Sequence, residues 1–125
     1  MNTPFLLCLQ GQSMLSKMTT VKEILAEMKS PSPSDAALVQ KAYEFGLNAH
    51  KDDKRYSGEP YFVHPAAAAK ILAGLGMDAA TIVAGLLHDA IEDGKVTDEE
   101  VTAEFGPEVL FLIQGVTKLG KHKYR

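Results

Sequence analysis

The chain has 125 residues, enough for one domain that buries a hydrophobic core without covalent cross-links. Thirteen basic and sixteen acidic residues give a net charge of −3, so no overall attraction to nucleic acid or to an anionic membrane is expected. The single cysteine, Cys8, excludes an internal disulfide framework and favours a reducing, cytoplasmic location.

Residues 1–19 are expected to form a poorly ordered extension that precedes the domain, which takes residues 20–125. The extension contains a short apolar run, PFLLCL, but no Lys or Arg comes before it, as one would in a secretory signal. No run in the chain approaches the roughly 20 apolar residues that a membrane span needs, so no membrane segment is predicted.

The first predicted helix is short. Thr19 and Thr20 can cap VKEILAEMK, and Glu23 lies three residues after Thr20, in the capping-box position. Pro31 and Pro33 then break the helix.

The second predicted helix, DAALVQKAYEFGLNAHK, is the clearest amphipathic one and is expected to be capped by Ser34. Its apolar residues recur at the helical period and are expected to face the core; they are Leu38, Ala42, Phe45 and Ala49.

Residues 52–60 are charged and contain Gly and Pro, so they are predicted to be an exposed connection. His64 precedes Pro65, which suits the first turn of a helix that ends near Gly76. Asp78 is then expected to cap AATIVAGLLHDAIED, an almost wholly apolar helix and therefore the predicted centre of a bundle.

Thr97, with Glu100 in the capping-box position, predicts a further helix, and PEVLFLIQGVTKLG predicts the last. No stretch alternates apolar and polar residues as a half-buried strand does. The predicted fold class is therefore all-α.

The central helix ends in a cluster of titratable side chains. His88 and Glu92 are four residues apart, as are Asp89 and Asp93, so two polar faces meet at one helix end. Carboxylates this close raise one another's pKa unless a cation or a shared proton compensates, and imidazole with carboxylate suits a divalent metal. Two alternatives stay open: a solvated helix end for the acidic pair, and a buried, hydrogen-bonded core histidine for His88.

These motifs keep a specific order: RYSGEPYFVHP, then HD, IED, FGPEV and GVTKLGK. Over residues 34–125 the chain closely resembles the hydrolase domain of the RelA/SpoT homologue family, HD-domain phosphohydrolases that degrade the alarmone (p)ppGpp. The resemblance implies an HD-type helical bundle. It also implies a metal ion, Mn²⁺ in the family, held by His64, His88 and Asp89.

By the same resemblance, Glu92 and Asp93 orient the attacking water and support proton transfer. The reaction implied is hydrolysis of the 3′-pyrophosphate of guanosine tetra- or pentaphosphate, which releases pyrophosphate and GDP or GTP. Members of the family that have lost hydrolysis depart at this acidic pair, which is intact here.

The resemblance assigns the loop KRYSGEPY to nucleotide recognition. Arg55 matches an arginine that lies against the guanine base, and Ser57 and Tyr61 match positions that shape the pocket. Many members have a basic residue where this chain has Tyr56, which leaves one phosphate contact of the family open. Lys51 and Lys54 extend a local basic patch, for which a merely solvated loop is the alternative.

Two other histidines are not expected to bind the metal. His50 ends the amphipathic helix beside the loop, and we expect it to be structural or to support the site indirectly. His122 lies among lysines and is expected to be exposed.

Family members carry a fourth metal ligand, an Asp, in a later motif that resembles LADRLHN. The resemblance therefore implies a bundle that is incomplete at its C-terminus, weakly active or inactive alone, with exposed apolar faces that favour a homodimer. Two other functions stay open: hydrolysis of another nucleotide phosphate by an HD-type enzyme, and a catalytically silent nucleotide-binding or regulatory module.

Overall fold

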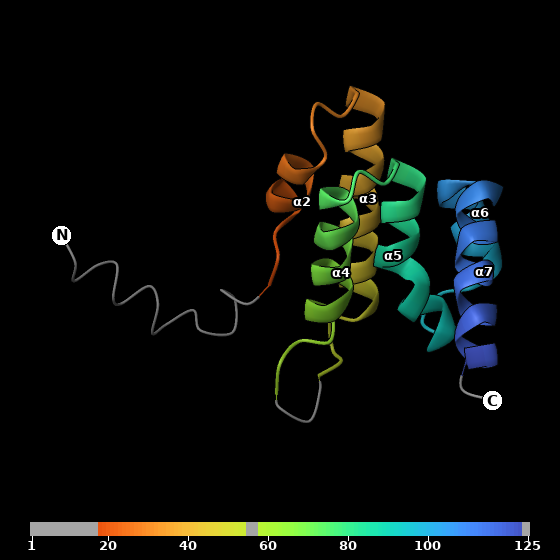
Figure 1. Cartoon of the computed structure of the whole chain (residues 1–125). Helices are drawn as coiled ribbons and strands as arrows, with labels where there is room; N and C mark the ends of the chain where they lie inside the picture. The colour runs from red at the N-terminus through yellow and green to blue at the C-terminus, as the bar shows by residue number, and fades with distance from the viewer. Residues whose placement is uncertain (1–17, 55–57, 124–125) are drawn as a thin grey trace, which may run out of the picture.

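The computed structural model describes residues 18–54 and 58–123, and within them the protein is helical (Figure 1). The helices are α2 (Val21–Glu27), α3 (Pro33–Ala49), α4 (Val63–Gly74), α5 (Ala79–Glu92), α6 (Asp98–Phe105) and α7 (Pro107–Lys123). The described part contains no strand and only one isolated bridge, between Lys54 and Pro60. The predicted all-α class is confirmed. None of the described helices is both long and apolar enough to cross a membrane.

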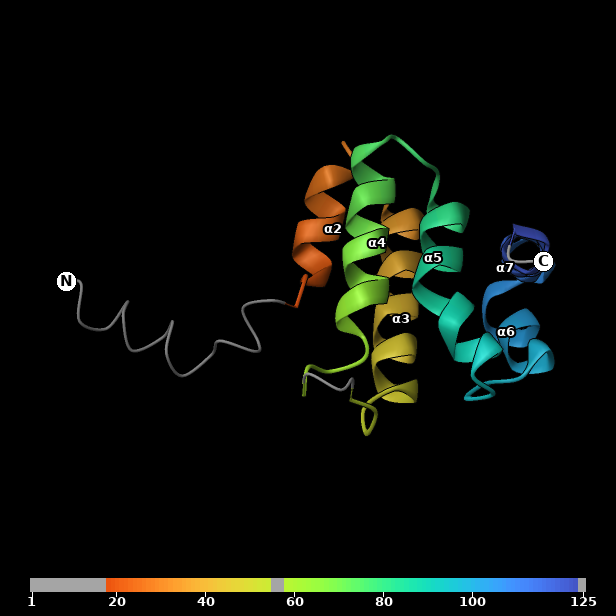
Figure 2. The same ribbon diagram turned by 60° about the horizontal axis from the view of Figure 1, so that its bottom comes forward.

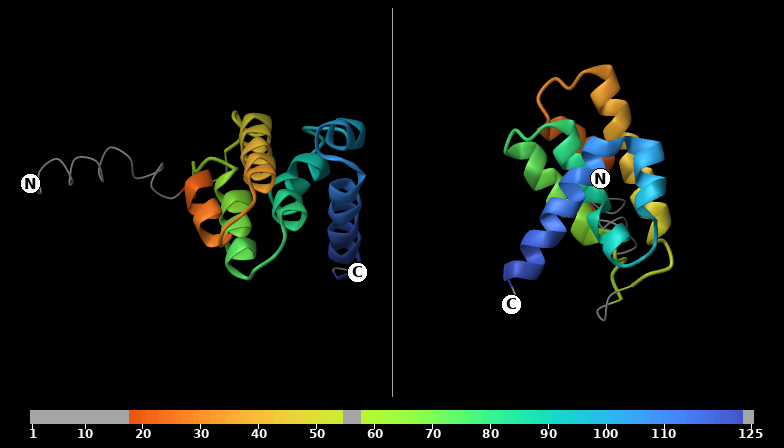
Figure 3. Two further views of the ribbon diagram at one scale, coloured as in Figure 1. Left: turned by 90° about the horizontal axis from the view of Figure 1, so that it is seen from above. Right: turned by 90° about the vertical axis from the view of Figure 1, so that its right-hand side faces the viewer.

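Helix α5 is the centre of the bundle, as its composition predicted. It packs against α3, α4 and α7, while α2 covers α3 and α4 on one side and α6 packs on α7 on the other. Figure 2 shows α5 between these two groups, and the left view of Figure 3 keeps the same order, while the right view has α6 and α7 in front. Seven of its side chains are buried: Ala79, Ile82, Val83, Ala84, Leu86, Leu87 and Ala90.

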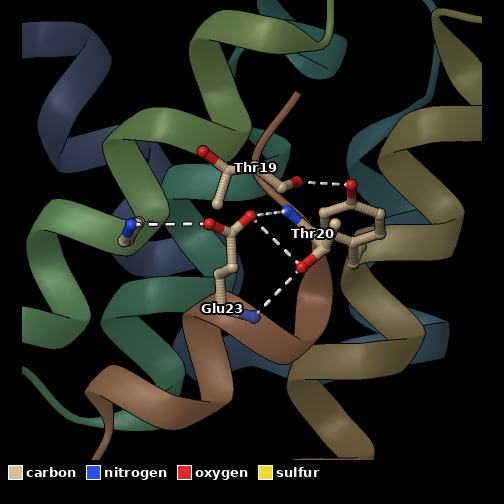
Figure 4. A network of polar contacts seen from close by, with 5 residues as sticks. Thr19, Thr20 and Glu23 are labelled. Carbon is tan, nitrogen blue, oxygen red and sulfur yellow. Dashed lines mark hydrogen bonds and ion pairs between the residues drawn. The ribbon is translucent and has the colours of Figure 1, made fainter. Parts of the chain in front are cut away.

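The start of α2 is tied to two neighbouring helices. Glu23 N–H donates to Thr20 Oγ1 at 3.2 Å, and Thr20 N–H donates to Glu23 Oε1 at 2.8 Å, which confirms the predicted capping box (Figure 4). Tyr43 on α3 donates its hydroxyl to Thr19 O at 2.6 Å, and Lys70 on α4 lies 3.6 Å from Glu23 Oε2. Of the expected extension, residues 1–17 lie outside the described residues.

The predicted cap of α3 was wrong by two residues. Ser32, not Ser34, accepts the N–H of Asp35 at 3.1 Å, and Pro33 occupies the first turn. A proline fits there because its fixed φ suits the first turn and its missing N–H would have no helical partner. The helix ends at Ala49 rather than Lys51.

The core-facing side of α3 is also rotated from the predicted one. Ala42 is buried as expected, but Leu38, Phe45 and Ala49 are only partly buried at the margin of the core. The fully covered positions are Val39, Ala42, Tyr43 and Gly46. The rotation follows from packing on two sides, because α2 and α5 both contact α3.

Candidate active site

The C-terminal half of α5 brings His88 and Asp89 together. His88 Nε2 lies 3.1 Å from Asp89 Oδ1, and His88 Nδ1 lies 3.1 Å from the carbonyl oxygen of Gly85. Both ring nitrogens thus face acceptors, which favours the protonated ring, and the hydrogen bond to Asp89 raises the pKa of His88. The same hydrogen bond lowers the pKa of Asp89. Both shifts favour the charged forms of the pair, and 27% of each side chain is exposed.

The third predicted ligand, His64, lies on the neighbouring helix. It is the second residue of α4, where Pro65 occupies the first turn as predicted, and its side chain is exposed. The charges of His50 and His64 add to that of His88 in lowering the pKa of Asp89, so three imidazoles act on this one carboxylate.

The donor set fits a divalent metal by its chemistry, since imidazole nitrogen and carboxylate oxygen are its ordinary ligands. The side chains do not converge, however. Among residues 18–54 and 58–123, no three His, Cys, Asp or Glu side chains are grouped closely enough to hold an ion. Asp89 pairs with His88 instead.

The predicted acidic pair lies at the very end of α5. Glu92 is the last helical residue and Asp93 is the C-cap, with its N–H bonded to Asp89 O at 2.9 Å; both side chains are exposed. The charge of Glu92 contributes to the raised pKa of His88, as expected for residues four apart on one face. Gly94 then takes a φ of 73°, which ends the helix.

The segment after α3 approaches this end of α5. His50, the C-cap of α3, is buried; its ring stacks on Tyr61 with centroids 4.8 Å apart, and its Nδ1 lies 3.2 Å from Asp53 Oδ2. Its Nε2 has no hydrogen-bond partner among the described residues. These contacts agree with the structural role expected of His50. Two of the predicted nucleotide-binding residues, Arg55 and Ser57, lie outside the described residues.

Sequence reasoning missed one pair beside the site. Lys95 Nζ donates to Asp53 Oδ1 at 3.1 Å, and hydrogen bonds from Lys95 and from His50 lower the pKa of Asp53. The two residues are 42 positions apart, so the local sequence pattern does not predict their contact.

An open apolar groove of about 380 Å³ lies beside His88, between α4, α5 and α7. Apart from His88 and Thr81, its lining is apolar, with Ile71, Leu72 and Leu112 the largest side chains. Such a lining suits a hydrophobic side chain rather than a phosphate group.

Comparison with known proteins defines the class first. A protein-family model described as HD domain matches residues 42–125, more than half of the chain. The chain therefore belongs to the HD domain family, whose hydrolases are metal-dependent.

Individual relatives then confirm the resemblance to RelA/SpoT-type enzymes. A guanosine-3′,5′-bis(diphosphate) 3′-pyrophosphohydrolase of Aquifex aeolicus (strain VF5) is 47% identical over 106 residues, which cover 85% of this chain and 15% of the relative. A GTP pyrophosphokinase of Myxococcus xanthus is 52% identical over 91 residues, 73% of this chain and 12% of the relative. The 3′-pyrophosphohydrolase of Vibrio cholerae serotype O1 is 42% identical over 106 residues, again 85% and 15%. The chain thus spans about a seventh of the length of these relatives.

Proposed function

We propose that this chain carries a metal-dependent hydrolase site that cleaves the 3′-pyrophosphate of (p)ppGpp. The observation that carries the proposal is the contact of His88 Nε2 with Asp89 Oδ1, 3.1 Å apart, at the polar end of a buried helix. The names of two relatives, both 3′-pyrophosphohydrolases of guanosine-3′,5′-bis(diphosphate), supply the substrate. The lone Cys8 supports a reducing, cytoplasmic compartment for such an enzyme.

His64, His88 and Asp89 would hold the metal ion, for which Mn²⁺ is our proposal. When bound, a divalent ion lowers the pKa of a water ligand and offsets negative charge on phosphate oxygens. To hold it, His88 must release the proton that Asp89 stabilises, because a ligating imidazole is neutral. Asp89 would also have to exchange its contact with His88 for one with the ion.

Glu92 and Asp93 would accept the proton of the attacking water and hold that water in line. Their exposure supports this role, since both carboxylates can reach solvent and one of them interacts electrostatically with His88. Water attacks the phosphorus next to the 3′ oxygen, the bond to that oxygen breaks, and the 3′ oxygen takes up a proton. The products are pyrophosphate and GDP from ppGpp, or GTP from pppGpp.

Arg55, Ser57 and Tyr61 would bind the nucleotide. A guanidinium group can stack on a purine ring and can also pair with negatively charged phosphate, so Arg55 suits binding of the guanine base. Tyr61, which lies in the described part, is held by its stacking on His50, and this supports a fixed edge for the pocket.

A second function is favoured by one observation. Because His64, His88 and Asp89 are not grouped within the described residues, a catalytically silent nucleotide-binding module is the alternative. A hydrolase of another nucleotide phosphate is the third, and a panel of nucleotides separates it from the first.

We also propose self-association as a homodimer. The three most exposed large apolar side chains in the described part are Ile71 on α4, Leu75 at the C-cap of α4 and Phe111 on α7, with 63%, 66% and 74% of each exposed. Surfaces of this kind favour association. Light scattering of the purified chain over a concentration series tests it, and a monomer at every concentration refutes it.

The test of the function is pyrophosphate release from ppGpp with and without Mn²⁺. The variant is His88→Ala and the matched control is His122→Ala, which changes a histidine that is not assigned to the site. We expect weak release that needs Mn²⁺, disappears in His88→Ala and persists in His122→Ala. Mn²⁺-dependent binding of ppGpp without release would support the silent module instead. The absence of both binding and release would refute the proposal.

A further inference from the structure

Asp53 joins three parts of the molecule through one residue. Its Oδ1 accepts from Lys95 Nζ at 3.1 Å, its Oδ2 lies 3.2 Å from His50 Nδ1, and its backbone carbonyl accepts the N–H of Tyr61 at 3.1 Å. The first partner follows α5, the second ends α3, and the third leads into α4. The side chain of Asp53 is 27% exposed, so these partners cover part of it and the rest meets solvent.

On the α3 side, Asp53 is attached to a rigid point. Its N–H donates to the carbonyl of His50 at 2.9 Å, and the N–H of His50 donates to Gly46 O at 3.2 Å. The buried His50 ring is held between this bond pattern and Tyr61, with the two rings inclined by only 22°. The start of the segment 51–61 therefore cannot move without disturbing the end of α3.

On the α5 side, Lys95 is also fixed at its backbone. Its N–H donates to Ala90 O at 2.8 Å, and the next residue, Val96, donates to the same carbonyl at 3.3 Å and is buried. The backbone of Lys95 is thus fixed in the turn that follows α5, two residues after Asp93, and its side chain extends to Asp53.

The two ends of the loop that follows α3 pair with each other beside Asp53. Lys54, next to Asp53, forms an antiparallel bridge with Pro60, next to Tyr61. The base of this loop is consequently tied to the C-terminal ends of both α3 and α5.

We propose that Lys95 is a positioning residue, which acts through Asp53 to hold the base of the loop, residues 51–54 and 58–61, against the end of α5 that carries Glu92 and Asp93. This inference rests on the proposed function, in which the segment binds the nucleotide and the acidic pair serves its 3′-pyrophosphate. Lys95 touches neither substrate nor metal in this role. It holds the described base of the nucleotide-binding loop beside the acidic pair, so its loss should weaken nucleotide binding and leave the chemical step nearly unchanged.

A Lys95→Met variant tests the role, because methionine keeps most of the length and removes the charge. Lys95→Arg is the conservative variant, which can still donate to Asp53. Lys41→Met is the matched control: its Nζ also bridges two elements, at 2.9 Å from Glu104 Oε1, but it joins α3 to α6 away from the site. Any general effect of losing an ion pair between elements appears in Lys41→Met as well.

The first readout needs no substrate. Hydrogen exchange of the Tyr61 amide reports closure of the loop base, because that N–H donates to Asp53 O. We expect Lys95→Met to speed this exchange by about 2- to 5-fold, the range of a partly exposed ion pair. Lys95→Arg and Lys41→Met should exchange like the wild type.

The second readout is the split between KM and kcat for ppGpp with Mn²⁺, or the Kd for ppGpp if the chain binds without turnover. We expect Lys95→Met to raise KM or Kd by about 2- to 5-fold with kcat nearly unchanged, the pattern of lost nucleotide binding, and Lys95→Arg to restore it. Asp53→Ala should have the same effect, and adding Lys95→Met to it should change nothing further.

Unchanged exchange in Lys95→Met overturns the inference, and so does faster exchange with unchanged KM and Kd. If the wild type neither binds nor hydrolyses ppGpp, the proposed function fails first, and the positioning role fails with it. That case is recognised by the wild type itself rather than by any variant.

Discussion

Gly46 sets the distance between α3 and α5, and replacing it with alanine should destabilise the fold. A Cβ at this position lies 2.7 Å from Phe62 Cε1, 3.2 Å from Phe62 Cζ and 3.1 Å from the carbonyl oxygen of Leu86. The first neighbour is a buried ring that packs edge-on against Tyr43 with centroids 5.1 Å apart, and the last is backbone of the central helix. Neither can give way without moving a helix.

The magnitude follows from two opposing effects. Alanine is favoured over glycine in a helix interior by about 1 kcal/mol. Overpacking a well-filled core costs about 1–3 kcal/mol, and two unyielding neighbours place Gly46→Ala in the upper part of that range. The net loss is about 1–2 kcal/mol, and each kcal/mol lowers Tm by about 4–8 °C in a domain of this size.

Gly85→Ala is the matched control within the same bundle. Its Cβ meets only Leu72 Cδ1, at 2.8 Å, which is the end of a flexible and partly buried side chain. The helix propensity gain of about 1 kcal/mol should therefore survive, and Tm should stay level or rise. Thermal unfolding of both variants by circular dichroism compares them. Equal Tm values for Gly46→Ala and Gly85→Ala would refute the claim that α3 and α5 meet at Gly46.

Three further outcomes are expected. Asp78→Ala removes the N-cap of α5, where Thr81 N–H donates to Asp78 at 3.0 Å, and should lower the free energy of unfolding by about 1 kcal/mol. Hydrogen bonds from Thr81 lower the pKa of Asp78 below 3.8. The difference in free energy of unfolding between the wild type and Asp78→Ala should therefore be complete above pH 3.8 and disappear as the pH falls through the lowered pKa. Urea unfolding at several pH values tests this. Asp89 raises the pKa of His88 above 6.5, and a proton on His88 competes with a metal ion. The affinity for Mn²⁺, measured by calorimetry, should therefore fall as the pH is lowered through that raised pKa. An affinity that stays constant down to about pH 6 would contradict this. Glu92→Gln should leave Mn²⁺ binding intact and slow ppGpp turnover by about 10²–10⁴-fold, whereas loss of Mn²⁺ binding would make Glu92 a ligand.

The helix starts could be predicted wherever one cap residue was available. Asp78 and Thr97 each bond to an N–H three residues later, so the interaction that begins the helix lies within four letters of sequence. The segment SPSPS contains three serines, and the prediction chose Ser34. Ser32 is the cap because Pro33 fits the first turn directly after it. The rotation of α3 had no local signal, because it depends on which two helices pack against it.

The features of the site also fall into those that local sequence predicts and those that depend on tertiary contacts. The spacing of His88 and Glu92 predicted one shared face, and the charge of Glu92 does act on His88. The pairing of Asp53 with Lys95 could not be predicted, since it arises where two loops meet after separate helices. Whether His64 and Asp89 converge on one ion is likewise a matter of side-chain rotation between two helices, which residue spacing does not encode.

The end of α5 combines features that oppose stability. Three carboxylates, Asp89, Glu92 and Asp93, lie at a helix C-terminus, where the backbone dipole disfavours negative charge, and the last turn contains no Lys or Arg. Imidazoles compensate Asp89 and His88 also attracts Glu92, but the side chains of Glu92 and Asp93 are exposed to solvent. A bound cation would relieve this repulsion and stabilise the folded state as well as the phosphate group of a substrate. An apolar helix that ends in such a cluster breaks the local rules that the rest of the chain obeys, and functional sites are where such conflicts are expected.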